Sequence, residues 1–180
     1  MSGSNDTSGA NGHDGIDGIE PVAPELRSPG DFEPALLWVL GQAIDSRARR
    51  ITCVDPDFAA WPLDHAPVLD RLAAWLRLPQ RRLVLVACDF AQIPRRHPRF
   101  VAWRRDWSHA VDAWAPSEGV DIALPTLLFD DRRLCLQVYE PALGRGRITR
   151  DESVVRQWRD EVDALLQRCE AAFPAHHLGL

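Results

Sequence analysis

The sequence of 180 residues contains no lysine: all 21 of its basic residues are arginine. Catalysis through a lysine Schiff base and phosphate binding by the lysine of a P-loop are therefore excluded. Arginine remains a strong ligand for anions, because its planar guanidinium can donate two parallel hydrogen bonds to one phosphate or carboxylate. Any cationic side chain that binds an anion in this chain must therefore be an arginine or a histidine.

Cysteine is sparse, and its spacing carries no motif. The four cysteines, Cys53, Cys88, Cys135 and Cys169, are far apart and form no Cys-x-x-Cys pair. Three of them lie within apolar runs, where cysteine behaves as a small hydrophobic residue. We expect them to be reduced, as in a cytoplasmic protein, and we expect neither a metal site nor another cofactor.

Long apolar segments are absent as well. No apolar run is long enough to cross a bilayer, and the N-terminus has neither the basic nor the apolar region of a signal peptide. The sequence therefore predicts a cytoplasmic protein without a membrane span.

Negative charge is concentrated in the first part of the chain. Residues 1–33 contain seven acids and one arginine, which leaves 19 acids and 20 arginines for the rest. Residues 1–30 are also rich in small polar residues, which bury too little apolar surface to fold. We predict a disordered acidic tail at 1–30, a folded domain at 31–174 and a C-terminal tail at 175–180. Because the folded part is nearly neutral, attraction to nucleic acid or membranes requires a local basic patch.

A buried strand is predicted in the middle of the chain. Residues 83–88 form the apolar run LVLVAC, which is typical of a strand covered by helices on both faces. The other patterns predict a helix at 34–48, a strand at 51–54, a helix capped by Asp64, a basic helix from 99, a weak strand at 109–114, a hairpin at 123–139, a loop at 141–150 and a helix at 151–173. The predicted fold class is α/β, a single domain with a small mixed β-sheet flanked by helices on both faces.

Three phrases in this order, ITCVDPDF, RRLVLVACDF and ALPTLLFDDRRL, resemble one half of the phospholipase D-like fold. The resemblance extends over residues 34–173. In that family the last phrase carries H-x-K-x-x-x-x-D, in which the histidine attacks phosphorus and the lysine holds a phosphate oxygen. The residues at the histidine and lysine positions are Ala123 and Pro125 in an alignment on Asp130, or Leu124 and Thr126 in an alignment on Asp131.

The resemblance therefore implies a degenerate single half that lacks the family's nucleophile and its cation. It is similar to bacterial domains that accompany or derive from this superfamily. Phosphodiesterase activity by the family mechanism is not expected. A homodimer does not supply the missing histidine, because the second copy lacks it too.

An alternative is a magnesium-dependent phosphatase. The strand followed by Asp55-Pro56-Asp57 resembles the first motif of haloacid-dehalogenase-like phosphatases, in which the first aspartate is the nucleophile. Further carboxylates at predicted strand ends are Asp89, Asp130 and Asp131. Against this reading, Ala59 replaces the expected Thr or Val, no lysine is available, and Asp-x-Asp is also an ordinary turn sequence.

Basic residues cluster just past the predicted central strand. The candidate ligand-binding residues there are Asp89, Arg95, Arg96, His97 and Arg99. Ligands of open α/β sheets gather at this edge, and helix N-termini favour anions. Trp103 and Trp107 lie nearby and allow base stacking, although their helical spacing with Phe100 also suits a core position.

The leading hypothesis is a non-catalytic phospholipase D-like module that binds an anionic ligand or a protein partner. The magnesium-dependent phosphatase is one alternative. The other is a protein-interaction adaptor that pairs sheets across a homodimer, as the two halves do in this superfamily.

Overall fold

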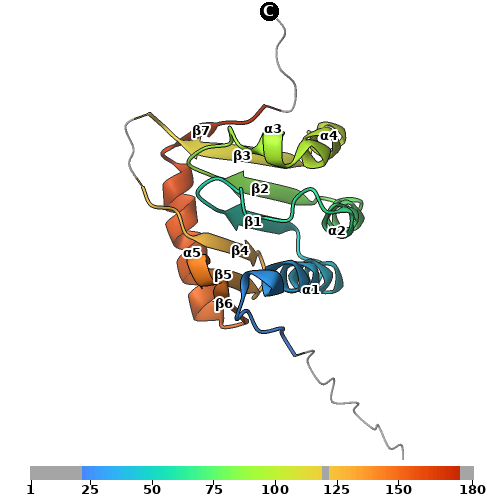
Figure 1. Ribbon diagram of the computed structural model, residues 1–180, viewed down its shortest axis with the longest axis vertical. Coiled ribbons are helices and arrows are strands. Elements are labelled where there is room, and N and C mark those ends of the chain that lie inside the picture. The colour runs from blue at the N-terminus through green and yellow to red at the C-terminus, as the bar shows by residue number, and fades with distance from the viewer. Residues whose placement is uncertain (1–21, 119–121, 175–180) are drawn as a thin grey trace, which may run out of the picture.

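One mixed sheet of seven strands runs through the computed structural model, which describes residues 22–118 and 122–174. The strand order is β6-β5-β4-β1-β2-β3-β7 (Figure 1). The elements are η1 (Pro29–Asp31), α1 (Phe32–Asp45), β1 (Arg50–Val54), α2 (Ala66–Leu76), β2 (Arg82–Val86), α3 (Ile93–Arg96), α4 (Pro98–Asp106), β3 (Val111–Pro116), β4 (Thr126–Asp130), β5 (Cys135–Glu140), η2 (Pro141–Leu143), β6 (Arg145–Thr149), α5 (Glu152–Leu166) and β7 (Cys169–Ala171).

The central strands are parallel and the outer ones antiparallel. β1 pairs with β2, and β2 with β3, both in parallel, while β4 runs antiparallel to β1. The strand–helix–strand unit and the hairpin are thereby confirmed. β1 and β2 begin at the edge of the sheet where β4 ends, since Arg50 pairs with Arg82 and Ile51 with Asp130.

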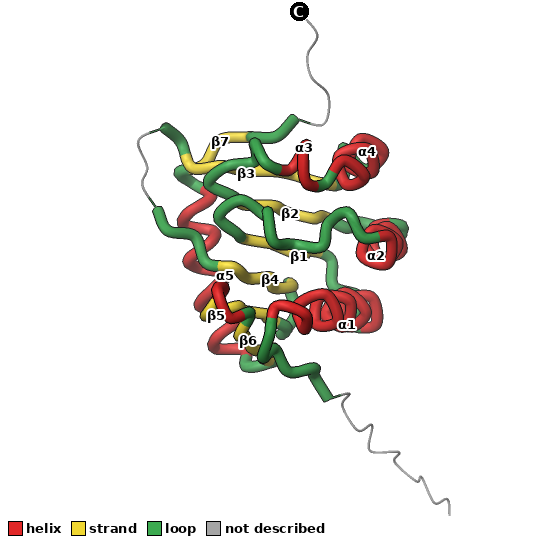
Figure 2. The backbone as a smooth tube through the Cα atoms, viewed as in Figure 1, coloured by secondary structure: helices red, strands yellow, loops and turns green. Residues whose placement is uncertain are grey.

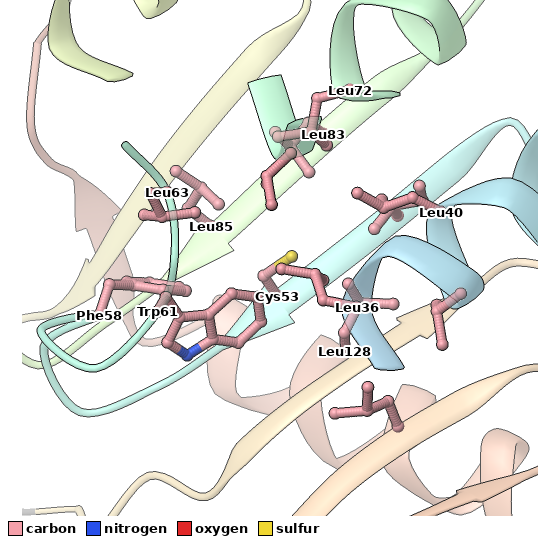
Figure 3. Close-up of a cluster of buried hydrophobic side chains, with 14 of the residues drawn as sticks. Leu36, Leu40, Cys53, Phe58, Trp61, Leu63, Leu72, Leu83, Leu85 and Leu128 are labelled. Atoms are coloured by element: carbon pink, nitrogen blue, oxygen red, sulfur yellow. The ribbon is translucent and has the colours of Figure 1, made fainter. Parts of the chain in front are cut away.

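Helices cover both faces of the sheet, as predicted. α1, α2 and α4 lie on one face and α5 crosses the other (Figures 1 and 2). Apolar side chains of β1 and β2 divide between the two layers: Cys53 and Leu85 face α1 and α2 (Figure 3), whereas Val54 and Val86 belong to the cluster under α5. Burial on both faces explains why these strands read as continuous apolar runs. No helix in the described part of the chain is long and apolar enough to cross a bilayer.

The predictions for the last third of the fold are partly wrong. The expected loop at 141–150 contains η2 and strand β6, which pairs with β5. The expected helix at 151–173 ends at Leu166, and β7 then pairs antiparallel with β3. Pairing across the sheet overrides the helical spacing of the sequence, because without β7 the outer edge of β3 would leave its amides and carbonyls unpaired.

Ordered structure begins before residue 31. Leu26 is buried, and its carbonyl accepts a hydrogen bond from the amide of Gly146 at 3.1 Å. Gly146 lies so close to β5 that a Cβ would stand 2.5 Å from the carbonyl oxygen of Gln137. Residues 1–21 of the predicted acidic tail and the predicted C-terminal tail at 175–180 lie outside the described residues.

Candidate functional site

The residues that the resemblance aligns with the histidine and lysine of the phospholipase D-like motif lie where the chain enters β4. Leu124 is buried, Ala123 is exposed, and Pro125 precedes the first ladder residue, Thr126. The hydroxyl of Thr126 donates to Asp55 at 2.6 Å. None of these side chains offers an imidazole or an amine, so this segment provides neither the family's nucleophile nor its phosphate-binding cation.

Asp55, at the end of β1, is a buried carboxylate with four hydrogen-bond donors. Its Oδ1 accepts from the backbone amides of Asp57 (3.0 Å) and Phe58 (2.7 Å). Its Oδ2 accepts from Trp61 Nε1 (2.9 Å) and from the Thr126 hydroxyl. A carboxylate that acts as a nucleophile or metal ligand needs accessible lone pairs. Asp55 uses its lone pairs to hold the loop that follows β1 against β4.

Two of the remaining candidate carboxylates lie near Asp55: Asp57 lines the same pocket, and the amide of Asp89 donates to the carbonyl of Pro56 at 3.2 Å. Asp57 accepts from the amide of Ala59 and Asp89 from that of Ala91, so each closes its own turn. Asp130 and Asp131 lie at the opposite end of the sheet, where Asp130 is opposite the first residues of β1. Within the described residues, no three His, Cys, Asp or Glu side chains are arranged to hold a metal ion.

Asp130 is buried at the β4–β5 turn. Burial raises the pKa of its carboxyl, and hydrogen bonds from the amides of Leu134 and Arg132 oppose that rise. Its neighbour Asp131 accepts from the amide of Arg49 at 2.9 Å. Both acids therefore shape the turn and its contact with the start of β1.

The predicted ligand-binding residues after β2 separate into exposed and buried groups. Arg95, Arg96 and Arg99 are exposed, and among the described residues nothing bonds to their guanidinium groups. His97 is buried, with Nε2 3.0 Å from the carbonyl oxygen of Phe58. Because a carbonyl only accepts, this nitrogen carries the proton and donates it, so His97 serves as a structural contact.

The start of α4 was expected to favour an external anion. Asp64 occupies it instead: its carboxylate accepts from the amides of Arg99 at 2.6 Å and Phe100 at 3.0 Å. The prediction that Asp64 caps α2, the helix that follows it in the chain, is wrong, because the N-cap of α2 is His65. Trp103 stacks on the buried Phe100 with ring centroids 5.5 Å apart, which favours the core reading of the tryptophans over base stacking.

A pocket of about 430 Å³ lies beside the segment that enters β4, and Leu124 forms part of its wall. Its walls include Asp55, Pro125, Thr126, Gln137 and Tyr139. No arginine contributes to these walls, so the pocket has no cation for a phosphate. The exposed arginines predicted to bind a ligand, Arg95, Arg96 and Arg99, belong to α3 and α4 and do not line this pocket.

A second group of arginines was missed by the sequence reading. Arginine pairs at 49–50 and 81–82 stand at the starts of β1 and β2, the second arginine of each pair being the first residue of the strand, and a third pair at 132–133 lies in the β4–β5 turn. The signal was present in the sequence, because parallel strands begin at the same edge of a sheet. It was missed because residues 49 and 50 fell between the predicted helix at 34–48 and the predicted strand at 51–54, whereas β1 begins at Arg50.

No protein-family model and no curated protein matches the sequence. Several solved structures are similar to it at low identity. The archaeal chromatin protein TrmBL2 is 14% identical, with a TM-score of 0.58 over 86% of this chain and 56% of that one. Nuc, a phospholipase D family member from Salmonella typhimurium, is 10% identical, with a TM-score of 0.50 over 75% of this chain and 89% of that one.

Phosphatidylserine synthase from Haemophilus influenzae Rd KW20 is 11% identical, with a TM-score of 0.52 over 87% of this chain and 40% of that one. The chain thus spans little more than half of TrmBL2 and less than half of the synthase. A likeness at this identity concerns the backbone and not the chemistry. The protein has a phospholipase D-like α/β fold.

Proposed function

We propose that this protein is a non-catalytic module with a phospholipase D-like fold that binds a phosphate-bearing ligand. The observation that supports a non-catalytic role is the set of residues found where the chain enters β4. Alanine, leucine, proline and threonine occupy the positions of the nucleophile and the cation, and the adjacent Asp55 carboxylate is fully hydrogen-bonded. These residues cannot attack a phosphodiester by the family mechanism.

The second half of the proposal is supported by the loop arginines, Arg95, Arg96 and Arg99. They are exposed and lie past the carboxyl end of β2, the side of an α/β sheet where ligands collect. Guanidinium groups suit phosphate because they bind it with two parallel hydrogen bonds. TrmBL2, whose fold is similar, binds DNA, which makes nucleic acid the first phosphate-bearing ligand to try.

The test is binding of labelled single- and double-stranded oligonucleotides across a salt series. We expect dissociation constants of about 1–100 µM at low salt, weakening steeply as salt rises. The loop variant, Arg95→Ala/Arg96→Ala/Arg99→Ala, should bind at least about tenfold more weakly. The control variant, Arg145→Ala/Arg156→Ala/Arg168→Ala, removes the same charge from exposed positions elsewhere and should bind nearly as the wild type does.

Two results would contradict the proposal. Equal binding by the loop variant and the control variant would remove the loop arginines as the ligand site. Hydrolysis of a generic phosphodiester or phosphomonoester that requires Mg²⁺ and is lost in Asp55→Asn would establish the phosphatase alternative.

A further inference from the structure

Three arginine-bearing segments lie side by side at the edge of the sheet where β1 and β2 begin and β4 ends (Figure 1). The amide of Arg82 donates to the carbonyl of Arg49 at 2.9 Å, and the amide of Asp131 donates to the carbonyl of Arg50 at 3.1 Å. The backbone therefore fixes the order of the segments, with 131–133 next to 49–50 and 49–50 next to 81–82.

Two of these arginines are paired with acids. Arg50 contacts Asp163 at 3.5 Å, and Arg82 contacts Asp112 at 3.3 Å. Of the other arginines, Arg49, Arg81 and Arg132 form a set with Arg47, which lies just before the first segment, and we call these four residues the arginine edge. Among the described residues, no ion pair is formed by these four.

The four members of the arginine edge lie within electrostatic range of one another. The pKa of the Arg81 guanidinium is lowered by burial and then by the positive charges of Arg49, Arg132 and Arg47, whereas Asp131 opposes the decrease. Like charges held together reduce stability, and a bound polyanion relieves that repulsion.

The charges are spread along a row and do not converge on one point. Neighbouring strands are about 4.8 Å apart, so three adjacent segments cover about 10 Å. One strand of DNA presents a phosphate about every 3.4 Å along the helix axis, and the winding of the strand places consecutive phosphates farther apart than this, so a row of this length matches about two consecutive phosphates. A recess of about 200 Å³ opens beside the row, and its walls combine donors from Arg132, Gln42 and Ser46 with the carboxylate of Asp130.

A lipid surface fits the arginine edge less well. Peripheral membrane binding combines basic side chains with apolar ones that enter the bilayer. The exposed large hydrophobic residues of the described chain are Val22, Tyr139 and Leu143, and none of them belongs to the arginine edge. Tyr139 and Leu143 lie near the other ends of the strands, where β5 finishes.

We propose that the arginine edge is a second binding surface, which takes the sugar-phosphate backbone of a nucleic acid. This inference rests on the proposed function, since it assumes the same class of ligand. It uses different residues, which lie at the opposite ends of β1 and β2 from the loop arginines. It contacts phosphates and not bases, so its affinity depends strongly on salt and little on sequence.

The experiment uses the full chain and the same oligonucleotides. The edge variant, Arg49→Ala/Arg81→Ala/Arg132→Ala, should bind at least about tenfold more weakly than the control variant. The slope of log K against log salt should fall by about 2, as expected for the loss of two phosphate contacts. Arg49→Lys/Arg81→Lys/Arg132→Lys keeps the charge and should retain most of the affinity. Thermal unfolding of every variant shows that binding is measured on folded protein.

The possible outcomes separate this inference from the proposed function. If the edge variant binds like the control variant and the loop variant does not, the arginine edge is rejected and the loop site stands. If only the edge variant loses affinity, the inference stands and the loop site is rejected. If wild type binds no oligonucleotide at low salt, both are rejected. Binding to anionic vesicles but not to oligonucleotides rejects nucleic acid in favour of lipid.

Discussion

At the residue scale, Asp55 and His97 have side chains that could take part in catalysis, but here both hold the turn at Phe58. The amide of Phe58 donates to Asp55 at 2.7 Å, and its carbonyl accepts from His97 at 3.0 Å. Phe58 has φ of 57°, a left-handed conformation that costs a non-glycine residue about 1–2 kcal/mol. Hydrogen bonds on both sides of the residue hold it there, so Asp55 and His97 stabilise the strained turn.

Asp130 gives a prediction about pH. Burial raises the pKa of its carboxyl in the folded state above the ordinary value of 3.8. Between the ordinary and the raised pKa the folded state binds more protons than the unfolded state, so this group's contribution to stability grows as pH falls through that window and is lost as pH rises. The ionised carboxylate at neutral pH is thus a cost that Asn in its place would avoid.

We therefore expect Asp130→Asn to be at least as stable as wild type at pH 7. The Asn Oδ1 can still accept the two amide hydrogen bonds of the turn. The stability advantage should shrink or reverse near pH 4. Urea unfolding at both pH values measures this, with the exposed Asp160→Asn as the control. A large loss of stability in Asp130→Asn at pH 7 would show that the charge itself is needed.

At the scale of elements, the central half of the fold follows from sequence patterns. The apolar runs of β1 and β2, the helical spacing of α1 and α2, and the two strands around the polar β4–β5 turn were all predicted from local residues. The strands β6 and β7 were not predicted, because β7 has only three residues and neither strand carries an alternating apolar pattern. Only their partners, β5 and β3, make them strands.

The sequence indicated where the candidate residues lie, but not which of their hydrogen-bonding groups are already occupied. Sequence placed Asp55, Asp89 and the loop arginines past the ends of the parallel strands, as the structure has them. It could not indicate which lone pairs and amides were already occupied, because those contacts join distant segments. Thr126 bonds Asp55 across 71 positions, and Asp64 reaches the amide of Arg99 across 35.

The contact of Asp64 with α4 leads to a prediction at this scale. Asp64→Ala removes the carboxylate that accepts from the first amides of α4, and should lower the free energy of unfolding by about 1 kcal/mol, the usual value of a helix cap. Chemical denaturation measures the loss, with the exposed Asp70→Ala on α2 as the matched control. Equal stability of the two variants would mean that water caps α4 as well as Asp64 does.

At the scale of the whole molecule, charge is divided along the chain. Residues 1–21 contain four acids and no basic residue, so their deletion changes the net charge from −5 to −1. We expect the shortened protein to bind oligonucleotides a few-fold more tightly at low salt, with the difference vanishing as salt screens it. Asp6→Asn/Asp14→Asn/Asp17→Asn/Glu20→Gln makes the same change in charge at full length. If neither variant gains affinity, the acidic segment does not compete for the arginines.

The pairing of β7 with β3 has a consequence for biosynthesis. The ribosome makes β1, β2 and β3 early, but β3 lacks its outer neighbour until residue 171 has been added, and Leu26 lacks Gly146 for most of translation. A nascent chain stalled before β7 therefore presents an open strand edge, the surface through which unfinished β-sheets join one another. The sheet cannot be completed until β7 has emerged from the ribosome, and general chaperones that shield strand edges would act before that point.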